Sequence, residues 1–133
     1  MRLLLNVDVP DLPQAQAFYT AAFGWTPGRS LGGEVMELIG LDVPLFLLRK
    51  GAGTAGAGTS LREYDRHWTP VHGDLLVDDL DAAVNRALEA GARLEGAVRD
   101  AAWGRIAQLA DPFGHGWCLI QFTARGYDAI VDA

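Results

Sequence analysis

The chain has 133 residues, and half of them are hydrophobic, which is enough for one domain with its own core and excludes an obligatorily disordered chain. Seventeen acidic against eleven basic residues give a net charge of -6, the wrong sign for binding phosphate backbones. We therefore expect neither nucleic acid nor an anionic membrane as a partner. The negative charge suits a cationic or neutral hydrophobic ligand. Many soluble proteins are equally acidic, however, because the charge keeps them in solution.

The N-terminus and the single cysteine predict a cytoplasmic protein. The apolar run over residues 3–5 is interrupted too soon to form a signal-peptide core, and no stretch approaches the roughly 20 apolar residues of a membrane span. Cys118 cannot form an intrachain disulfide, so nothing indicates an oxidising compartment. We expect a soluble protein inside the cell.

Each half of the sequence predicts a strand followed by an amphipathic helix. Short apolar runs over 3–9 and 73–77 are followed by apolar residues at helical spacing, over 12–23 and 80–88. An aspartate before each helix can accept hydrogen bonds from the first turn, and a glycine after it can adopt the left-handed cap. The proposed N-caps are Asp11 and Asp79, and the proposed C-caps are Gly24 and Gly91.

The two halves are copies of one unit. The segment 9–12, with Ala15 after it, recurs 68 residues later as 77–80, with Ala83 after it. Further strands are expected over 35–39, 44–48, 93–96, 105–109 and 116–122. The order β-α-β-β-β therefore occurs twice, which predicts an α+β fold.

A glycine-rich segment separates the copies. It suits a flexible connector, and a mobile rim of a binding site is the alternative. It is not a phosphate loop, because it opens no helix and carries no Lys-Ser/Thr pair. We expect repeat one over residues 1–50, the linker over 51–66, repeat two over 67–123 and a C-terminal tail over 124–133.

This organisation resembles the vicinal oxygen chelate superfamily, which includes glyoxalases, extradiol dioxygenases and bleomycin-resistance proteins. The resemblance rests on the Val-x-Asp-Leu corner of each copy, on Phe18-Tyr19 and on Phe23-Gly24-Trp25. The segment 103–105, Trp-Gly-Arg, followed by Asp-Pro-Phe-Gly over 111–114, is most similar to the antibiotic-binding bleomycin-resistance branch. The resemblance implies cup-shaped mixed sheets with the helices on the outside, and a homodimer.

The resemblance also implies metal ligands on the first and last strands of each repeat in the enzymes, and most of them are missing here. His72 stands at one such position, whereas Leu4 stands at its counterpart. Cys118 replaces a glutamate, and the strand over 44–48 has no ligand. Two donors are fewer than the three or four that this chemistry needs, so we expect no metal and no cofactor.

A cup without metal can still bind a ligand through aromatic and polar side chains. Trp103 is the favoured stacking residue, and Arg105 on the same strand face either contacts the ligand or forms a surface ion pair. Each of the other candidate residues could instead pack in the core or lie on the surface without a ligand. The sequence does not decide which face of the strand over 44–48 lines the cup. The candidate ligand-binding residues are Trp103, Arg105, Trp68, His67, Trp25, His72, Phe46, Glu37 and Cys118.

These observations predict a binding protein that sequesters a hydrophobic aromatic or cationic antibiotic without chemistry, giving drug resistance or self-resistance to a producer. Two enzymes are the alternatives. One is a metal-dependent glyoxalase or dioxygenase that uses His72. The other is a metal-free enzyme acting on a natural-product intermediate, with His72 or His67 as general base.

Overall fold

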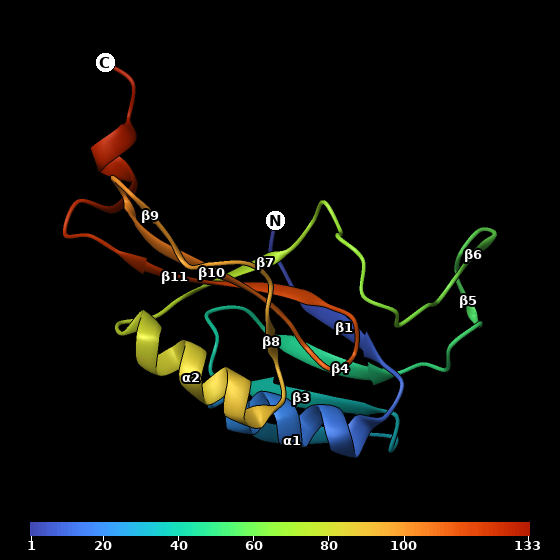
Figure 1. Cartoon of the computed structure of the whole chain (residues 1–133). Coiled ribbons are helices and arrows are strands. Elements are labelled where there is room, and N and C mark those ends of the chain that lie inside the picture. The colour runs from blue at the N-terminus through green and yellow to red at the C-terminus, as the bar shows by residue number, and fades with distance from the viewer. The chain divides into compact units, whose positions relative to one another are not determined.

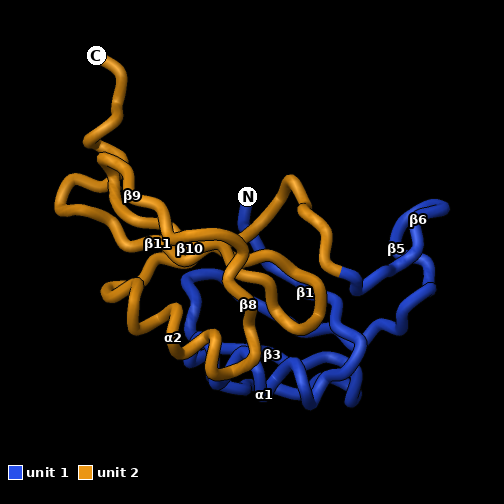
Figure 2. The backbone as a smooth tube through the Cα atoms, viewed as in Figure 1, with its two compact units in different colours: residues 1–65 blue, residues 66–133 orange.

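The computed structural model describes all 133 residues as two compact units, residues 1–65 and 66–133 (Figure 2). Each unit has one α-helix and one mixed sheet (Figure 1), which confirms the predicted α+β class. None of the helices is both long enough and apolar enough to cross a membrane.

Unit 1 is a four-stranded sheet in the order β1-β4-β3-β2, with α1 packed on one face. Its elements are β1 (Leu5–Val9), α1 (Leu12–Phe23), β2 (Thr26–Leu31), β3 (Val35–Ile39) and β4 (Leu45–Arg49). β1 and β4 are parallel, and the other neighbours are antiparallel. Leu45 and Leu47 are fully buried, whereas Phe46 and Leu48 are partly exposed and project from the face opposite α1.

Unit 2 repeats this plan with a five-stranded sheet in the order β7-β11-β10-β8, and β9 pairs with β10. Its elements are β7 (Gly73–Leu76), α2 (Leu80–Ala90), β8 (Arg93–Leu94), β9 (Arg99–Ala101), β10 (Gly104–Ala110), β11 (Gly116–Phe122) and a short 3-10 helix, η1 (Gly126–Ile130). β7 and β11 are parallel, as β1 and β4 are in unit 1. The predicted β-α-β-β-β order is thus present in unit 1, and unit 2 has the same order with one additional strand, β9.

The predicted helix boundaries are confirmed by the capping geometry. The carboxylates of Asp11 and Asp79 each accept a hydrogen bond from the backbone N–H three residues later, at 2.9 and 3.0 Å. Gly24 and Gly91 end the helices with φ of 71° and 115°, a left-handed conformation that other residues adopt at a cost. Both helices therefore begin and end where local side-chain chemistry requires.

Two parts of unit 1 differ from the sequence-based expectation. β2 was not predicted, because its segment contains Pro27 and Gly28 and is exposed throughout. The expected flexible connector contains a small hairpin of β5 (Ala55–Ala57) and β6 (Ser60–Leu61). Arg62 holds the end of this segment to unit 1, since its Nε donates to Asp8 Oδ2 at 2.7 Å.

Candidate functional site

Three potential metal or ligand contacts converge on the sheet of unit 2. Asp74 on β7 pairs in register with Cys118 on β11, and Cys118 pairs in register with Gln108 on β10. His72 lies just before β7, and its Nε2 is 3.3 Å from Asp74 Oδ1. Three potential ligand atoms, one from each of His72, Asp74 and Cys118, lie within 4.8 Å of one another. We call these three residues the His-Asp-Cys cluster.

The His-Asp-Cys cluster lies on the face of the sheet opposite α2. Side chains of the other face contact the helix: Gln121 Oε1 accepts from the Leu80 N–H at 2.8 Å, and Arg105 pairs with Asp81. Successive side chains of a strand alternate between the two faces of the sheet, so Cys118, three residues before Gln121, projects away from α2. Asp74 is the register partner of Cys118 on β7, so its side chain lies on the same face. The cluster therefore lies on the face that points away from α2, which we call the open face of unit 2 because no helix covers it, although Cys118 itself is buried.

Burial and charge keep the thiol of the cluster protonated. Cys118 is 2% exposed, whereas the His72 and Asp74 side chains are 29% and 39% exposed. Burial, reinforced by the charge and hydrogen bond of Asp74, raises the pKa of Cys118 to about 11, although a hydrogen bond from Gln108 acts the other way. A nucleophilic cysteine needs a lowered pKa, so without a bound metal Cys118 is not suited to nucleophilic catalysis.

Aromatic surface adjoins the cluster at Trp68. The indole is 53% exposed, and its ring centroid lies 4.7 Å from that of the His72 imidazole, at an interplanar angle of 48°. An exposed indole beside polar groups is a platform on which a flat apolar ligand can stack.

An ion pair adjoins the same face. Arg66 Nη2 lies 2.8 Å from Glu95 Oε1, and this hydrogen-bonded pairing lowers the pKa of Glu95. The guanidinium covers Gly116, where a Cβ would lie 2.5 Å from Arg66 Nη2. Gly116 precedes Cys118 by two residues on the same strand face, so the open face carries charge of both signs.

The structure brings together three of the predicted site residues, Trp68, His72 and Cys118. Trp103 lies elsewhere, with its ring edge-on to Phe122 and Tyr127 at centroid distances of 6.3 and 5.5 Å. His67 is exposed, and its carbonyl accepts a hydrogen bond from Arg66.

Arg105 does not share a contact surface with Trp103. Its guanidinium lies on the α2 face and forms ion pairs with Asp81 and Asp100, at 3.1 and 3.2 Å. The structure therefore shows the surface ion pair that the sequence left open. The alternation of β10 points the Arg105 side chain toward α2, and this places its guanidinium beside Asp81.

The remaining predicted residues belong to unit 1. Trp25 is 4% exposed and stacks on Tyr19 at a centroid distance of 5.4 Å, so it packs in the core and has little surface left for a ligand. Phe46 is partly exposed on the open face of that sheet. Glu37 accepts hydrogen bonds from the Arg29 guanidinium at 2.9 and 2.8 Å, and this pairing lowers the pKa of Glu37 to about 2.

Asp74 was missed by the sequence analysis, although a signal was present. His72 and Asp74 are two residues apart at the start of a predicted strand, so strand alternation places them on one face. Asp74 does not stand at a metal-ligand position of the superfamily, so a comparison with that ligand pattern does not find it.

A second polar cluster supports the turn between β10 and β11. The Asp111 side chain is fully buried and accepts hydrogen bonds from Trp117 Nε1 at 3.0 Å and from the backbone N–H groups of Phe113 and His115. His115 Nδ1 lies 2.9 Å from the same carboxylate. All four residues belong to the turn or its flanking strand, so this cluster organises the fold.

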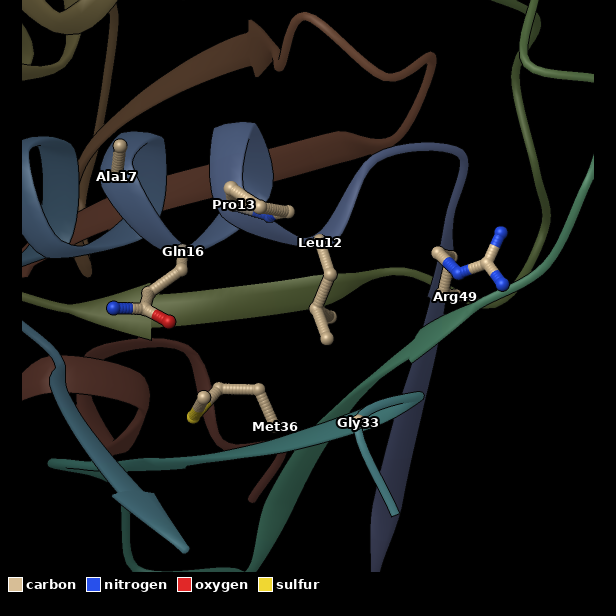
Figure 3. Close-up of a pocket in the computed structure, with 7 residues that line it drawn as sticks. All are labelled: Leu12, Pro13, Gln16, Ala17, Gly33, Met36 and Arg49. Atoms are coloured by element: carbon tan, nitrogen blue, oxygen red, sulfur yellow. The ribbon is translucent and has the colours of Figure 1, made fainter. Parts of the chain in front are cut away.

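Unit 1 contains a cavity of about 320 Å³ between the start of α1 and the β2–β3 hairpin (Figure 3). Leu12 and Gln16 point from α1 toward Met36 on β3. The remaining lining residues are Pro13, Ala17, Gly33 and Arg49. Arg49 Nη2 is paired with Glu34 at 2.6 Å. The cavity lies on the α1 face, contains none of the predicted site residues and offers no acid, base or nucleophile from its lining.

Sequence relatives of this chain occur in Mycobacterium and Streptomyces. It is 35% identical over 119 residues to an uncharacterized protein of Mycobacterium bovis, which covers 85% of this chain and 78% of that protein. It is 32% identical over 124 residues to the anthracycline biosynthesis protein DauV of Streptomyces sp. strain C5. That match covers 92% of this chain and 41% of DauV.

The fold is shared with solved structures of low sequence identity. The fosfomycin resistance protein FosX from Listeria monocytogenes, complexed with Mn(II) and sulfate ion, superposes with a TM-score of 0.72 at 16% identity, covering 94% of this chain and 92% of FosX. A glyoxalase-related enzyme from Fulvimarina pelagi gives 0.70 at 18% identity, covering 91% and 88%. Residues 5–120 match the sequence model of the glyoxalase-like domain. The chain therefore belongs to the glyoxalase-like domain family, and it shares its fold with these solved structures.

Proposed function

We propose that unit 2 binds a planar aromatic natural product non-covalently, and that the protein thereby sequesters an antibiotic or its precursor. The observation that carries this proposal is the exposed indole of Trp68 next to the His72 imidazole on the open sheet face. The two Streptomyces relatives at 32% identity, whose names refer to anthracycline biosynthesis, support a polycyclic aromatic ligand.

The neighbouring groups suit a ligand with a flat ring system and a polar or cationic substituent. The indole face supplies apolar contact area, and aromatic pairs contribute roughly 0.5–1.5 kcal/mol beyond burial of area. The partly exposed carboxylate of Asp74 can accept hydrogen bonds from an amino or hydroxyl group. The net charge of -6 also favours a cationic ligand over an anionic one.

A titration of the tag-free protein tests the proposal. An anthracycline, which is planar and carries an amino sugar, is added while tryptophan fluorescence and the heat of binding are followed. Anthraquinone-2-sulfonate, which is planar and anionic, serves as the matched ligand and should bind more weakly. Absence of binding by both ligands would overturn the proposal.

The binding form is proposed to be a homodimer in the cytoplasm. Sedimentation with and without the anthracycline measures the oligomeric state, and a single monomeric species under both conditions would contradict this part of the proposal.

A metal-dependent enzyme is the second candidate, and the His-Asp-Cys cluster is the observation that favours it. The ion in the FosX structure is Mn(II), but a thiol ligand suits Zn²⁺ better than Mn²⁺, which prefers oxygen donors. His72, Asp74 and Cys118 would together supply the three protein ligands that a catalytic zinc site needs. A bound divalent ion would polarise an oxygen atom of the ligand. Chromatography with mass spectrometry of the anthracycline after incubation separates the two candidates, since sequestration leaves both its retention time and its mass unchanged.

A further inference from the structure

We propose that residues 51–61 form a hinged flap beside the sheet of unit 1, and that the ion pair between Asp8 and Arg62 is the latch that holds the flap in the position seen. This segment is the glycine-rich stretch for which the sequence left a flexible connector and a mobile rim as alternatives. The proposal stands apart from the proposed function, because it concerns unit 1 alone and requires no aromatic ligand.

The flap buries no side chain against the sheet. All residues over 51–61 are exposed, and none of them is charged. The β5–β6 hairpin within the flap projects away from the sheet of unit 1 (Figure 1). A two-stranded hairpin without a buried face is at best marginally stable in water, so the position of the flap depends on the contacts at its two ends.

Arg62 joins the flap to the sheet. Its Nη1 donates hydrogen bonds to Thr54 Oγ1, at 3.3 Å, and to the carbonyl oxygen of Ala55. Its Nε donates to Asp8 Oδ2 on β1 at 2.7 Å. The Arg62 backbone also belongs to the hairpin, since its N–H donates to the Thr54 carbonyl and its carbonyl accepts from the Gly53 N–H, both at 2.8 Å. One guanidinium therefore binds the flap and the sheet at the same time.

Asp8 places the latch on the sheet face opposite α1. Its neighbours on β1, Val7 and Val9, are buried, so the Asp8 side chain projects to the other face. Its register partner on β4 is Leu48, which is partly exposed on that face. The Arg62 and Asp8 side chains are 20% and 34% exposed, and an ion pair that water still reaches stabilises weakly enough to open. Release of Arg62 would leave the Asp8 carboxylate free for another cation.

The flap begins at Lys50, whose backbone is held on both sides. The Lys50 N–H donates to the Val9 carbonyl oxygen at 2.9 Å, and the Tyr64 hydroxyl donates to the Lys50 carbonyl oxygen at 2.7 Å. A protease can reach the bond between Lys50 and Gly51 only when these hydrogen bonds open. Lys50 is the only lysine of the chain, so a protease that cleaves only after lysine reports the opening of this hinge.

Limited proteolysis tests the latch. Tag-free full-length protein is incubated with the lysine-specific protease, and the loss of the intact chain is followed by mass spectrometry. Asp8→Asn and Arg62→Gln should each raise the cleavage rate about threefold or more, and the double variant should be cleaved about as fast as the faster single variant. Arg29→Gln breaks a separate ion pair of the same sheet, with Glu37, and as the matched control it should leave the rate unchanged. Circular dichroism confirms that each variant is folded.

Urea separates opening of the flap from unfolding of the protein. Opening of a small exposed segment uncovers little surface, so the cleavage rate of the unaltered protein should change by less than about twofold up to about 1 M urea. A peptide with one lysine corrects for the effect of urea on the protease itself.

Three results would overturn the flap and its latch. These are a cleavage rate that is unchanged in either Asp8→Asn or Arg62→Gln, an equal rise in Arg29→Gln, and a rate that increases with urea as steeply as global unfolding does. None of these outcomes concerns the binding of an anthracycline to unit 2, so the proposed function and the flap fail independently.

Discussion

The two units place different side chains at equivalent positions of the same sheet plan. In unit 1 each residue of β4 lies between a residue of the parallel strand β1 and a residue of the antiparallel strand β3, and β11 of unit 2 lies in the same way between β7 and β10. In unit 1 the three residues are Asn6, Phe46 and Glu37, and in unit 2 they are Asp74, Cys118 and Gln108. The framework is therefore repeated while the chemistry is not, and the functional proposals rest on the side chains of unit 2.

The difference extends to how each charged group is used. In unit 1 the Glu37 carboxylate is occupied by the guanidinium of Arg29. In unit 2 the Asp74 carboxylate lies beside a histidine and a thiol. An acidic residue on an open sheet face is thus neutralised in one unit and is placed among potential ligands in the other.

The largest effect is expected for Asp111→Ala in the β10–β11 turn of unit 2. The substitution leaves the Trp117 Nε1–H and two backbone N–H groups without their buried acceptor, and we expect a loss of about 3 kcal/mol in the free energy of unfolding. Urea denaturation measures it. The control, Asp42→Ala in the exposed β3–β4 turn of unit 1, should change stability by less than about 0.5 kcal/mol. Similar losses of stability in both variants would show that the buried Asp111 carboxylate stabilises its turn no more than the exposed Asp42 does.

A smaller loss is expected for Gly73→Ala on β7. Gly73 pairs with Trp117, whereas the equivalent pair in unit 1 is Leu5 with Leu45. A Cβ at residue 73 would lie 2.7 Å from Trp117 Cζ3, so we expect overpacking to cost about 1–3 kcal/mol. Chemical denaturation of Gly51→Ala, where a Cβ would meet only an ordinary contact at 3.7 Å, supplies the comparison. An unchanged stability in Gly73→Ala would mean that Trp117 can move freely.

The ion pair of unit 1 gives a pH-dependent prediction. The Arg29 guanidinium holds the pKa of Glu37 at about 2, below the ordinary value of 4.5. The stabilisation from this carboxylate is therefore present above about pH 4.5 and is lost as the pH falls through 2. An NMR titration of Glu37 should show this low pKa, and Arg29→Ala should return it toward 4.5. A Glu37 that titrates near 4.5 in the unaltered protein would contradict the pairing.

Much of the fold is predictable from the sequence because the decisive signals are local. Asp11 and Asp79 lie next to the turns that they cap, and the apolar residues of each helix repeat over adjacent turns. β2 escapes prediction because its strand character comes from pairing with β3, while Pro27 and Gly28 argue against a strand.

The candidate site is only partly predictable because it depends on register between distant strands. His72 and Cys118 were identified from the resemblance, but the pairing of β7 with β11 is what brings Asp74 to them. The position of α2 likewise decides that Arg105 contacts Asp81 and does not project into the cup. Neither relation can be obtained from one strand considered alone.

The central claim is that the open face of unit 2 binds the aromatic ligand, and paired titrations test it most directly. Trp68→Ala and Phe46→Ala are each titrated with the anthracycline by calorimetry, after circular dichroism confirms that they are folded, and Trp103→Ala is measured beside them. We predict that Trp68→Ala raises Kd about tenfold, near the upper limit for an aromatic contact, while Phe46→Ala and Trp103→Ala stay within about twofold. A Kd that is unchanged in Trp68→Ala and raised in Phe46→Ala or Trp103→Ala would contradict the account.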